Sequence, residues 1–321
     1  METGEPTISP IEDVNIIRQG RLKVGTNHEI YWVEWGNKDV EVPIFYLHGG
    51  PGGGFSERDF SRFNPKKHRV VFHDQRGSGR STPFASTDHN TTSDLVSDIK
   101  KLMEETGFKK ISLYGFSWGS TLALIYALNY PDSVDKMLIG GIFLARDVDN
   151  DYYLRGRVAS HFPEVWDNFI ADVPEKYRAD VAGYYKKMLT SGNTKEKNNF
   201  AREWMKYESS ILRLDYVPER IEREISDFAS ESLAYLEAHY ILNNCFIEEN
   251  LILDNADKLK SINKIVIVQG RYDFICIPSA AYELHNVLAE NSILHYVASG
   301  HSGSDIIQRE VVKAYINILW Q

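Results

Sequence analysis

Cysteine and long apolar runs are what this sequence has least of. Only two of its 321 residues are cysteines, Cys245 and Cys276, and they lie far apart without the spacing of a metal site. We expect both to be buried free thiols in a reducing compartment, with one disulfide between them as the alternative. No apolar stretch approaches the roughly 20 residues that span a bilayer, so no membrane association is expected.

Positive charge is scarce as well. The chain has 36 Lys and Arg residues against 45 Asp and Glu residues, which gives a net charge of −9. A nucleic-acid partner is not expected, because phosphate binding uses clustered Lys and Arg. The segment 1–13 has acidic residues, no basic residue and no apolar core of a secretory signal, so a cytoplasmic location is predicted.

Up to residue 145, what is present is an alternation of strand and helix patterns. Thr92–Thr106 predicts a helix, because its apolar residues share one face and Gly107 is placed to end it. Short apolar runs predict strands at 28–35, 43–47, 69–73, 111–114 and 136–143. Alternation of this kind indicates an α/β fold with a mostly parallel sheet covered by helices on both faces.

Between residues 146 and 251 the strand pattern disappears. Helical patterns rich in Trp, Tyr, Glu and Lys replace it at 163–171, 175–189, 195–214 and 230–242. Strand patterns resume at 264–269 and 293–297, and a last amphipathic helix is predicted at 305–319. We therefore predict a core of residues 1–145 and 252–321, with an all-helical cap of residues 146–251 inserted after the sixth strand. Two independent domains are the alternative, and the returning strands argue against it.

The most informative motif is Gly115-Phe-Ser117-Trp-Gly119. It lies between the apolar run 111–114 and the helix-forming run 121–130, so it predicts a strand, a sharp turn and a helix. Small residues around the serine allow the backbone to bend tightly and leave the hydroxyl exposed above the sheet. This is the nucleophile elbow of an α/β-hydrolase, and Ser117 is the predicted nucleophile.

A serine hydroxyl needs a base to take its proton and a third group to orient that base. On this fold the order along the chain is serine, acid, histidine. Asp273 follows the apolar strand 265–269, and His301 follows the last strand, so both lie at carboxyl ends of strands, where α/β sites form. We prefer these two to the competing candidates, which are His161, His239, His285, His295, Asp254 and Asp257.

Two further motifs follow early strands. The glycine-rich run 47–54 follows the strand 43–47, so its backbone can come close to a bound carbonyl and donate an N–H to an oxyanion, together with the N–H of Trp118. The alternatives are a plain turn, or a phosphate loop that the missing Gly-Lys-Ser/Thr disfavours. The run 74–81 is interpreted as scaffold whose charged groups tie the turn beside the elbow.

Together these residues resemble the proline iminopeptidases (prolyl aminopeptidases), which are serine peptidases of the α/β-hydrolase fold. The resemblance implies release of an N-terminal residue, typically proline, from short peptides, without a cofactor or metal. It also implies the triad Ser117, Asp273 and His301 and the oxyanion donors Gly50 and Trp118. The similar segments are, in order, 48–54, 74–81, 117–120, 141–144, 270–273 and 300–301.

Two cap segments extend the resemblance. Trp204-Met-Lys-Tyr207-Glu208 is similar to the family's Trp-x-x-Trp-Glu, and 234–240 is similar to its second acidic segment, which contains Glu237. The resemblance implies that Glu208 and Glu237 hold the substrate's free amino or imino group, since paired carboxylates offset the desolvation of a cation. Taken alone, both would be ordinary helix-surface charges. An apolar wall for a pyrrolidine ring is expected from the aromatic residues Phe116, Trp118, Trp204 and Tyr207.

One departure from the family concerns arginine. Gly140 occupies the position of a family arginine, whereas Arg146 matches a second one. Loss of a guanidinium near the substrate predicts a relaxed preference for the rest of the peptide. Two other functions remain on the same fold, namely a carboxylesterase with the same triad and a non-catalytic ligand-binding module, against which the intact triad argues.

Overall fold

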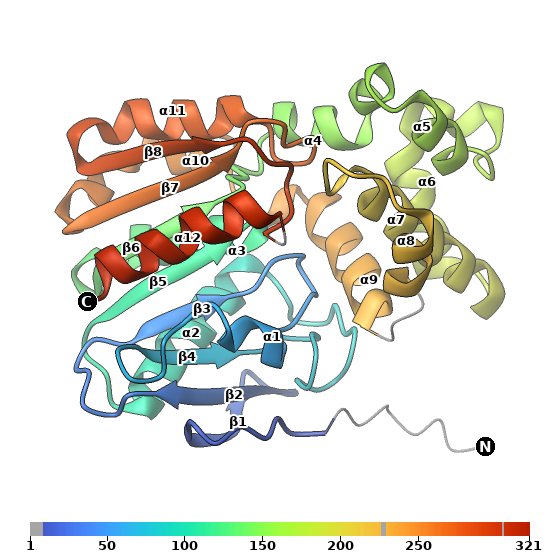
Figure 1. Ribbon diagram of the computed structural model, residues 1–321. Helices are drawn as coiled ribbons and strands as arrows, with labels where there is room; N and C mark the ends of the chain where they lie inside the picture. Colours follow the sequence, from blue (N-terminus) through green and yellow to red (C-terminus); the bar gives the residue numbers. More distant parts are fainter. Residues whose placement is uncertain (1–8, 226–228, 304) are drawn as a thin grey trace.

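The computed structural model describes residues 9–225, 229–303 and 305–321. Its centre is an eight-stranded sheet in the order β1-β2-β4-β3-β5-β6-β7-β8 (Figure 1). The pairs β1–β2 and β2–β4 are antiparallel, and all others are parallel. The strands are β1 (Ile16–Val24), β2 (His28–Gly36), β3 (Ile44–Leu47), β4 (Arg69–His73), β5 (Ile111–Phe116), β6 (Val134–Gly140), β7 (Lys264–Gly270) and β8 (Ser292–Val297).

The mostly parallel sheet predicted from the sequence is confirmed, with helices on both faces. One face packs against α2, α3 and α11, and the other packs against α1 and α12 (Figure 1). The core helices are α1 (Glu57–Phe60), α2 (Thr92–Thr106), α3 (Trp118–Asn129), α10 (Leu251–Asp254), α11 (Pro278–Leu288) and α12 (Ile306–Leu319). The sequence pattern predicts neither β1 nor α11, and it extends the sixth strand beyond Gly140, where β6 ends.

Local sequence signals explain where α2 begins and ends. The Thr91 side chain accepts a hydrogen bond from the Asp94 N–H, and the Asp94 carboxylate accepts one from the Thr91 N–H, which satisfies two donors at the helix start. Gly107 adopts a left-handed conformation with φ 83°, which a glycine reaches without strain and which ends the helix. The predicted bounds of this helix, Thr92–Thr106, are confirmed.

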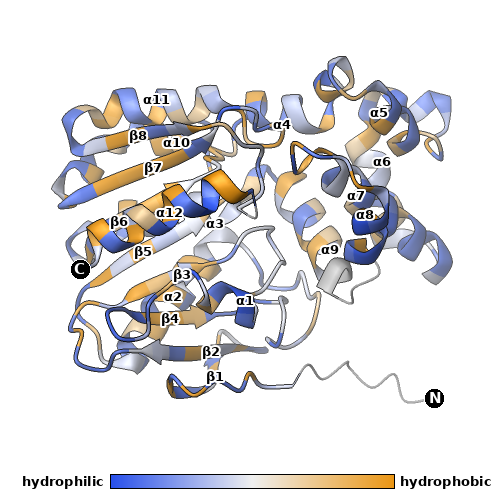
Figure 2. Ribbon diagram, viewed as in Figure 1, coloured by the Kyte–Doolittle hydropathy of each residue, from blue (hydrophilic) through white to orange (hydrophobic). Residues whose placement is uncertain are grey.

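Between β6 and α10 the described residues form only helices and turns. They gather beyond the carboxyl ends of the parallel strands (Figure 1). They also have their own buried apolar cluster, which includes Phe169, Tyr185 and Trp204, while polar residues cover much of their outer surface (Figure 2). These helices are α4 (Asp147–Leu154), α5 (Pro163–Phe169), α6 (Val181–Ser191), α7 (Thr194–Ile211), α8 (Pro218–Ile225) and α9 (Ala229–Ile241). The sequence pattern predicts neither α4 nor α8.

Both cysteines are buried free thiols, as expected from their separation. Among the described residues, no helix combines the length and apolar character that crossing a membrane requires. The segment 1–8, on which part of the localisation prediction rests, lies outside the described residues.

Candidate active site

Ser117 occupies a strained turn between β5 and α3. Its backbone has φ 57° and ψ −132°, a conformation that is uncommon for any residue with a side chain. A Cβ atom at Gly115 would lie 2.2 Å from the Gly119 carbonyl oxygen, and one at Gly119 would lie 2.2 Å from the Leu47 carbonyl oxygen. Only glycine fits on either side of the serine, which explains the Gly-x-Ser-x-Gly spacing of a nucleophile elbow.

His301 and Asp273 meet at the same edge of the sheet. Nδ1 of His301 lies 2.9 Å from Oδ2 of Asp273, and both side chains are buried. The other carboxylate oxygen of Asp273 accepts from the backbone N–H groups of Ile275, at 3.0 Å, and Cys276, at 2.8 Å. The acid is therefore fixed by its own loop and can fix the ring orientation of the histidine.

Gly141 lies between this pair and the elbow. A Cβ atom at Gly141 would be 3.2 Å from Cε1 of His301 and 3.3 Å from the backbone nitrogen of Ser117. The imidazole and the nucleophile residue thus approach Gly141 together, and a larger residue there would collide with both.

The electrostatic setting of His301 suits a general base. Burial acts to lower the pKa of its imidazole, but the neighbouring Asp273 carboxylate and the Cys276 side chain together outweigh burial and raise the pKa well above its usual value. Asp273 therefore stabilises the protonated ring, which is the form that exists once the serine proton has been taken.

The backbone around His301 is held by Leu212, which directly follows α7. The carbonyl oxygen of Leu212 accepts hydrogen bonds from the N–H groups of His301, at 3.0 Å, and Ser302, at 2.9 Å. No sequence pattern predicts this contact, because a backbone acceptor has no residue signature.

The glycine-rich loop lies beside the nucleophile. A Cβ atom at Gly49 would be 3.4 Å from Cβ of Ser117, and Gly50 adopts φ 113°, a value that favours glycine. Trp118 is the first residue of α3, so its N–H has no acceptor within the helix. Helix α9 contacts this loop, because the hydroxyl of Ser232 donates to the Gly52 carbonyl at 2.8 Å.

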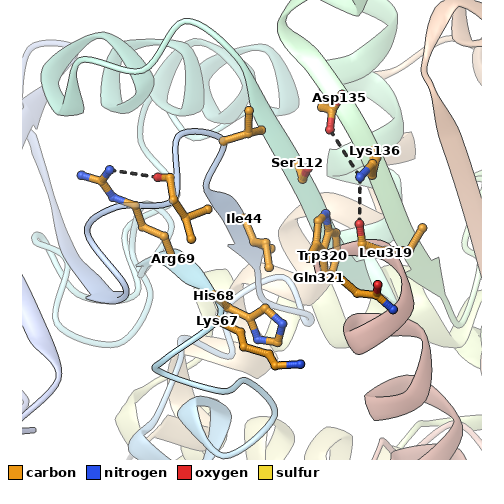
Figure 3. Close-up of a pocket in the computed structure, with 12 residues that line it drawn as sticks. Ile44, Lys67, His68, Arg69, Ser112, Asp135, Lys136, Leu319, Trp320 and Gln321 are labelled. Atoms are coloured by element: carbon orange, nitrogen blue, oxygen red, sulfur yellow. Dashed lines mark hydrogen bonds and ion pairs between the residues drawn. The ribbon is translucent and has the colours of Figure 1, made fainter.

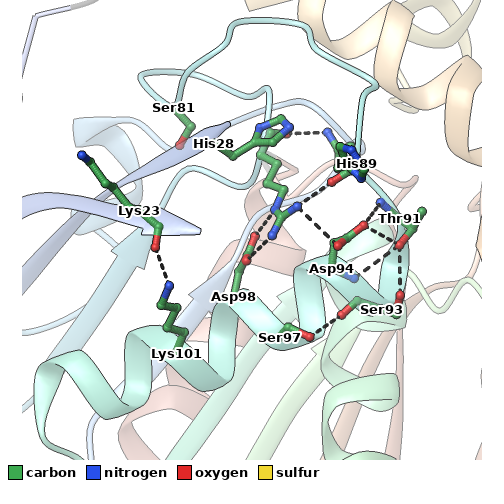
Figure 4. Close-up of polar contacts among 12 residues, drawn as sticks. Lys23, His28, Ser81, His89, Thr91, Ser93, Asp94, Ser97, Asp98 and Lys101 are labelled. Atoms are coloured by element: carbon green, nitrogen blue, oxygen red, sulfur yellow. Dashed lines mark hydrogen bonds and ion pairs between the residues drawn. The ribbon is translucent and has the colours of Figure 1, made fainter. Parts of the chain in front are cut away.

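The turn 74–81 is tied together by its charges, as predicted. Asp74 is fully buried and accepts from the backbone N–H groups of Phe55 and Arg80, each at 2.8 Å. Arg76 donates to both carboxylate oxygens of Asp98 on α2, at 2.6 and 2.8 Å. Figure 4 shows Asp98 and Asp94 on α2 within this network. The turn is thus fastened to the helix beside it.

The two cap glutamates lie together in the interior. Glu237 on α9 is 3% exposed and accepts from Nε1 of Trp204 at 3.0 Å. Burial raises the pKa of both carboxyls, and the adjacent Glu208 raises that of Glu237 well above its usual value. Oε2 of Glu208 is buried without a hydrogen-bond partner in the described part of the chain, and His301 is near enough to influence this group.

The predicted aromatic wall divides into two kinds of residue. Phe116 is partly exposed, whereas Trp204 and Tyr207 are buried in the cap cluster. The Tyr207 ring stacks on Phe169 with centroids 4.2 Å apart, and its hydroxyl donates to the Tyr153 carbonyl. Trp204 therefore contacts Glu237, and Tyr207 packs among buried aromatic residues, so the role of either ring in a substrate wall stays a prediction.

The inference drawn from Gly140 stays a prediction. A Cβ atom there would lie 2.1 Å from the Val268 carbonyl oxygen and 2.4 Å from Cε1 of Phe116, so in this backbone conformation the position has no space for a side chain. This steric limit explains why glycine occupies position 140. Arg146 is engaged elsewhere, in ion pairs with Asp149, at 3.0 Å, and with Glu283.

The competing histidines make structural contacts, as expected from their positions. Nδ1 of His295 lies 3.1 Å from the Tyr315 hydroxyl, and Nδ1 of His285 lies 2.7 Å from the Ser292 hydroxyl. His239 contacts the Asn90 carbonyl at 2.8 Å, and the His161 ring packs on Phe274.

A separate cavity of about 240 Å³ lies at the amino ends of the strands, and Ser112, His68 and Asp135 are among its lining residues (Figure 3). Oγ of Ser112 and Nε2 of His68 are buried, and neither has a hydrogen-bond partner within the described residues. Nδ1 of His68 accepts from the Asn64 N–H, so no carboxylate orients this ring. Ser112, His68 and Asp135 therefore do not form a second Ser-His-Asp triad.

Comparison with known proteins is consistent with this geometry. A family model for the α/β hydrolase fold matches residues 42–305. A proline iminopeptidase from Arabidopsis thaliana is 38% identical over 299 residues, which cover 92% of this chain and 77% of the plant protein. One from Neisseria gonorrhoeae is 39% identical over 289 residues, covering 89% and 91%. The chain belongs to the proline iminopeptidase family. It is accordingly a serine hydrolase of the aminopeptidase class.

Solved structures share the fold at low sequence identity. An esterase from Thermogutta terrifontis aligns with a TM-score of 0.64 and 18% identity, covering 94% of this chain and 97% of the esterase. An enol-lactonase from Burkholderia xenovorans LB400 aligns with a TM-score of 0.64 and 16% identity, covering 92% and 97%. At this identity the likeness concerns the fold alone.

Proposed function

We propose that this proline iminopeptidase homologue releases N-terminal proline from short peptides, with Ser117 as nucleophile, His301 as base and Asp273 as orienting acid. The observation that carries the proposal is the buried His301–Asp273 pair beside a strained serine turn. The related proteins named as proline iminopeptidases support the choice of substrate.

In the proposed mechanism, Ser117 attacks the carbonyl carbon of the first residue while His301 takes the hydroxyl proton. The N–H groups of Gly50 and Trp118 donate to the oxyanion that forms. The tetrahedral intermediate then collapses, and His301 gives its proton to the leaving amine. Water, deprotonated by the same imidazole, attacks the acyl-enzyme and releases proline with Ser117 restored.

The glutamate pair supplies the proposed requirement for a free N-terminus. The raised pKa values favour one proton shared between Glu208 and Glu237 as long as no cation lies beside them. A cationic amine between them would favour both carboxylates in the charged form and would supply the donor that Glu208 lacks. An N-blocked substrate offers no such charge.

We further propose that residues 146–251 act as a cap over this pocket, inserted between core residues 1–145 and 252–321. The separate apolar cluster of these helices supports that division. A small peptide with a free N-terminus is the proposed partner. A cytoplasmic location remains a proposal, supported by the two free thiols.

The decisive test is turnover of prolyl-naphthylamide by the native chain and by Ser117→Ala. We expect the native chain to release naphthylamine and the variant to lose at least about 10³-fold in kcat. N-blocked prolyl-naphthylamide is the matched substrate control and should remain intact. Undiminished turnover by Ser117→Ala would eliminate the proposed mechanism, and preferred cleavage of the blocked substrate would eliminate the aminopeptidase assignment.

A further inference from the structure

Gln75 belongs to the turn 74–81, and no step of the proposed mechanism uses it. Its side chain is 2% exposed, and the amide bridges two distant segments. Nε2 of Gln75 donates to the carbonyl oxygen of His48 at 2.9 Å, and Oε1 accepts from the indole Nε1 of Trp118 at 2.9 Å. An indole N–H can only donate and a carbonyl can only accept, so the amide orientation is unambiguous.

The two segments that Gln75 bridges are those that carry the proposed oxyanion donors. His48 directly follows β3 and lies two residues before Gly50, whereas Trp118 itself provides the second N–H. The Gln75 amide therefore connects the start of the glycine-rich loop directly to Trp118.

A third hydrogen bond joins Gln75 to His48, this time between the Gln75 main chain and the His48 side chain. The backbone N–H of Gln75 donates to Nε2 of His48 at 3.0 Å, and Nδ1 of His48 lies 2.9 Å from the Gly49 carbonyl. Burial lowers the pKa of His48, so the ring stays neutral and Nε2 remains an acceptor. The loop start is thus held by both the main chain and the side chain of Gln75.

We propose that Gln75 is a positioning residue of the oxyanion hole, which sets the separation of the Gly50 and Trp118 N–H groups without touching substrate. This inference rests on the proposed function of those two groups. Oxyanion donors act only if they point at the place where charge develops, so a displaced donor loses transition-state stabilisation while ground-state binding is kept.

The test compares the native chain with Gln75→Met, which keeps the length of the side chain and removes both hydrogen bonds. Turnover of prolyl-naphthylamide should lose roughly tenfold to hundredfold in kcat, with KM changed less than about threefold. Prolinal, an aldehyde that forms a tetrahedral adduct with Ser117, should bind weaker by the same factor as the loss in kcat/KM. Free proline, which forms no oxyanion, should bind as before.

Trp118→Phe provides a second variant if Gln75→Met does not fold. It removes the indole donor together with part of a buried ring, leaves the Gln75–His48 bond in place, and should shift the prolinal-to-proline affinity ratio in the same direction. In the double variant the two losses should not multiply, because both remove the same bridge.

Asn291→Leu is the matched control. Asn291 is another side-chain amide that joins separate chain positions, since it donates to the carbonyls of Leu259 and Ile262, but it lies just before β8, at the amino end of that strand. This variant should leave the prolinal-to-proline ratio unchanged.

Equal weakening of prolinal and proline by Gln75→Met, or native kinetics, would overturn the inference while leaving the proposed function intact. If the native chain neither cleaves prolyl-naphthylamide nor binds prolinal, the proposed function itself fails.

Discussion

Glu208 and Glu237 are two adjacent buried carboxyls, and two negative charges this close together would repel each other. Burial raises the pKa of both carboxyls, and the structure gives Glu208 one buried oxygen with no hydrogen-bond partner among the described residues. A buried acceptor without a donor costs free energy unless a ligand supplies one. We therefore expect this pair to bind a cationic group that can donate hydrogen bonds.

Neutralising either carboxyl should weaken substrates that carry a free amine. We expect Glu208→Gln and Glu237→Gln each to lower kcat/KM for prolyl-naphthylamide roughly tenfold to hundredfold, because a charge-assisted hydrogen bond is lost. Hydrolysis of a short acyl ester should change by less than about threefold. Glu203→Gln, on the same α7 helix as Glu208, is the control and should leave both activities unchanged. Parallel losses for the ester and the amine substrate would contradict the role of the pair.

The pKa of His301 predicts how activity depends on pH. The base must be neutral to accept the serine proton, and Asp273 holds its pKa above the usual value of 6.5. Activity should therefore rise with pH, with the midpoint of the acid limb above 6.5. A short acyl ester is the right substrate for this profile. It has no amine, so the protonation of Glu208 and Glu237 should not affect its binding. Asp273→Asn should lower both the rate and the midpoint, and a midpoint that does not move would contradict this account.

At the scale of elements, α2 is joined to the turn 74–81 by a buried ion pair. The side chains of Arg76 and Asp98 are 3% and 4% exposed. Asp98→Ala would leave the guanidinium buried with much of its compensation removed, so we expect a loss of about 3–5 kcal/mol in the free energy of unfolding. Urea denaturation followed by circular dichroism measures this value.

The exposed pair Asp257–Lys260 is the comparison for that variant. Its side chains are 88% and 49% exposed, so Lys260→Ala should cost at most about 1 kcal/mol. Similar losses for the two variants would show that the burial of the Arg76 pair adds nothing to stability.

Sequence patterns predicted those elements whose limits are set by neighbouring residues. The bounds of α2 follow from Thr91 and Gly107, and those of β4 follow from an apolar run. Sequence patterns did not predict α4 and α8, which have only eight residues each, too short a stretch for the apolar pattern alone to distinguish a helix from a loop. The missing space at Gly140 was also invisible, since it arises from Val268 on a strand far along the chain.

The candidate site was predictable to the same degree. Ser117, Asp273 and His301 each follow a strand, and the order of these residues along the chain is distinctive. The bridging role of Gln75 and the backbone contact of Leu212 depend on segments that meet only in the folded chain. No local pattern encodes such contacts.

At the scale of the whole molecule, the segment that follows α7 is linked to the core through His301. Its N–H and that of Ser302 donate to the carbonyl of Leu212, so a movement of α7 away from the core would remove their acceptor. We expect these two amides to exchange hydrogen for deuterium with the opening free energy of α7. Nuclear magnetic resonance can follow each amide separately.

Two nearby amides provide the reference for this measurement. Those of Arg271 and Tyr272 donate to Val297 and Ser299, which both belong to the core, and should exchange with the opening free energy of β8. If the amides of His301 and Ser302 follow β8 as well, the cap does not govern their protection.

The acceptor at Leu212 is a main-chain oxygen, and this has a consequence for how such proteins diverge. Any amino acid at this position provides the same carbonyl, so the residue can drift freely during evolution while its place in space stays fixed. Insertions and deletions in the cap should therefore be tolerated only where they leave this carbonyl in register. A designer who exchanges caps between homologues would need to match one backbone coordinate here, and could disregard the identity of the side chain.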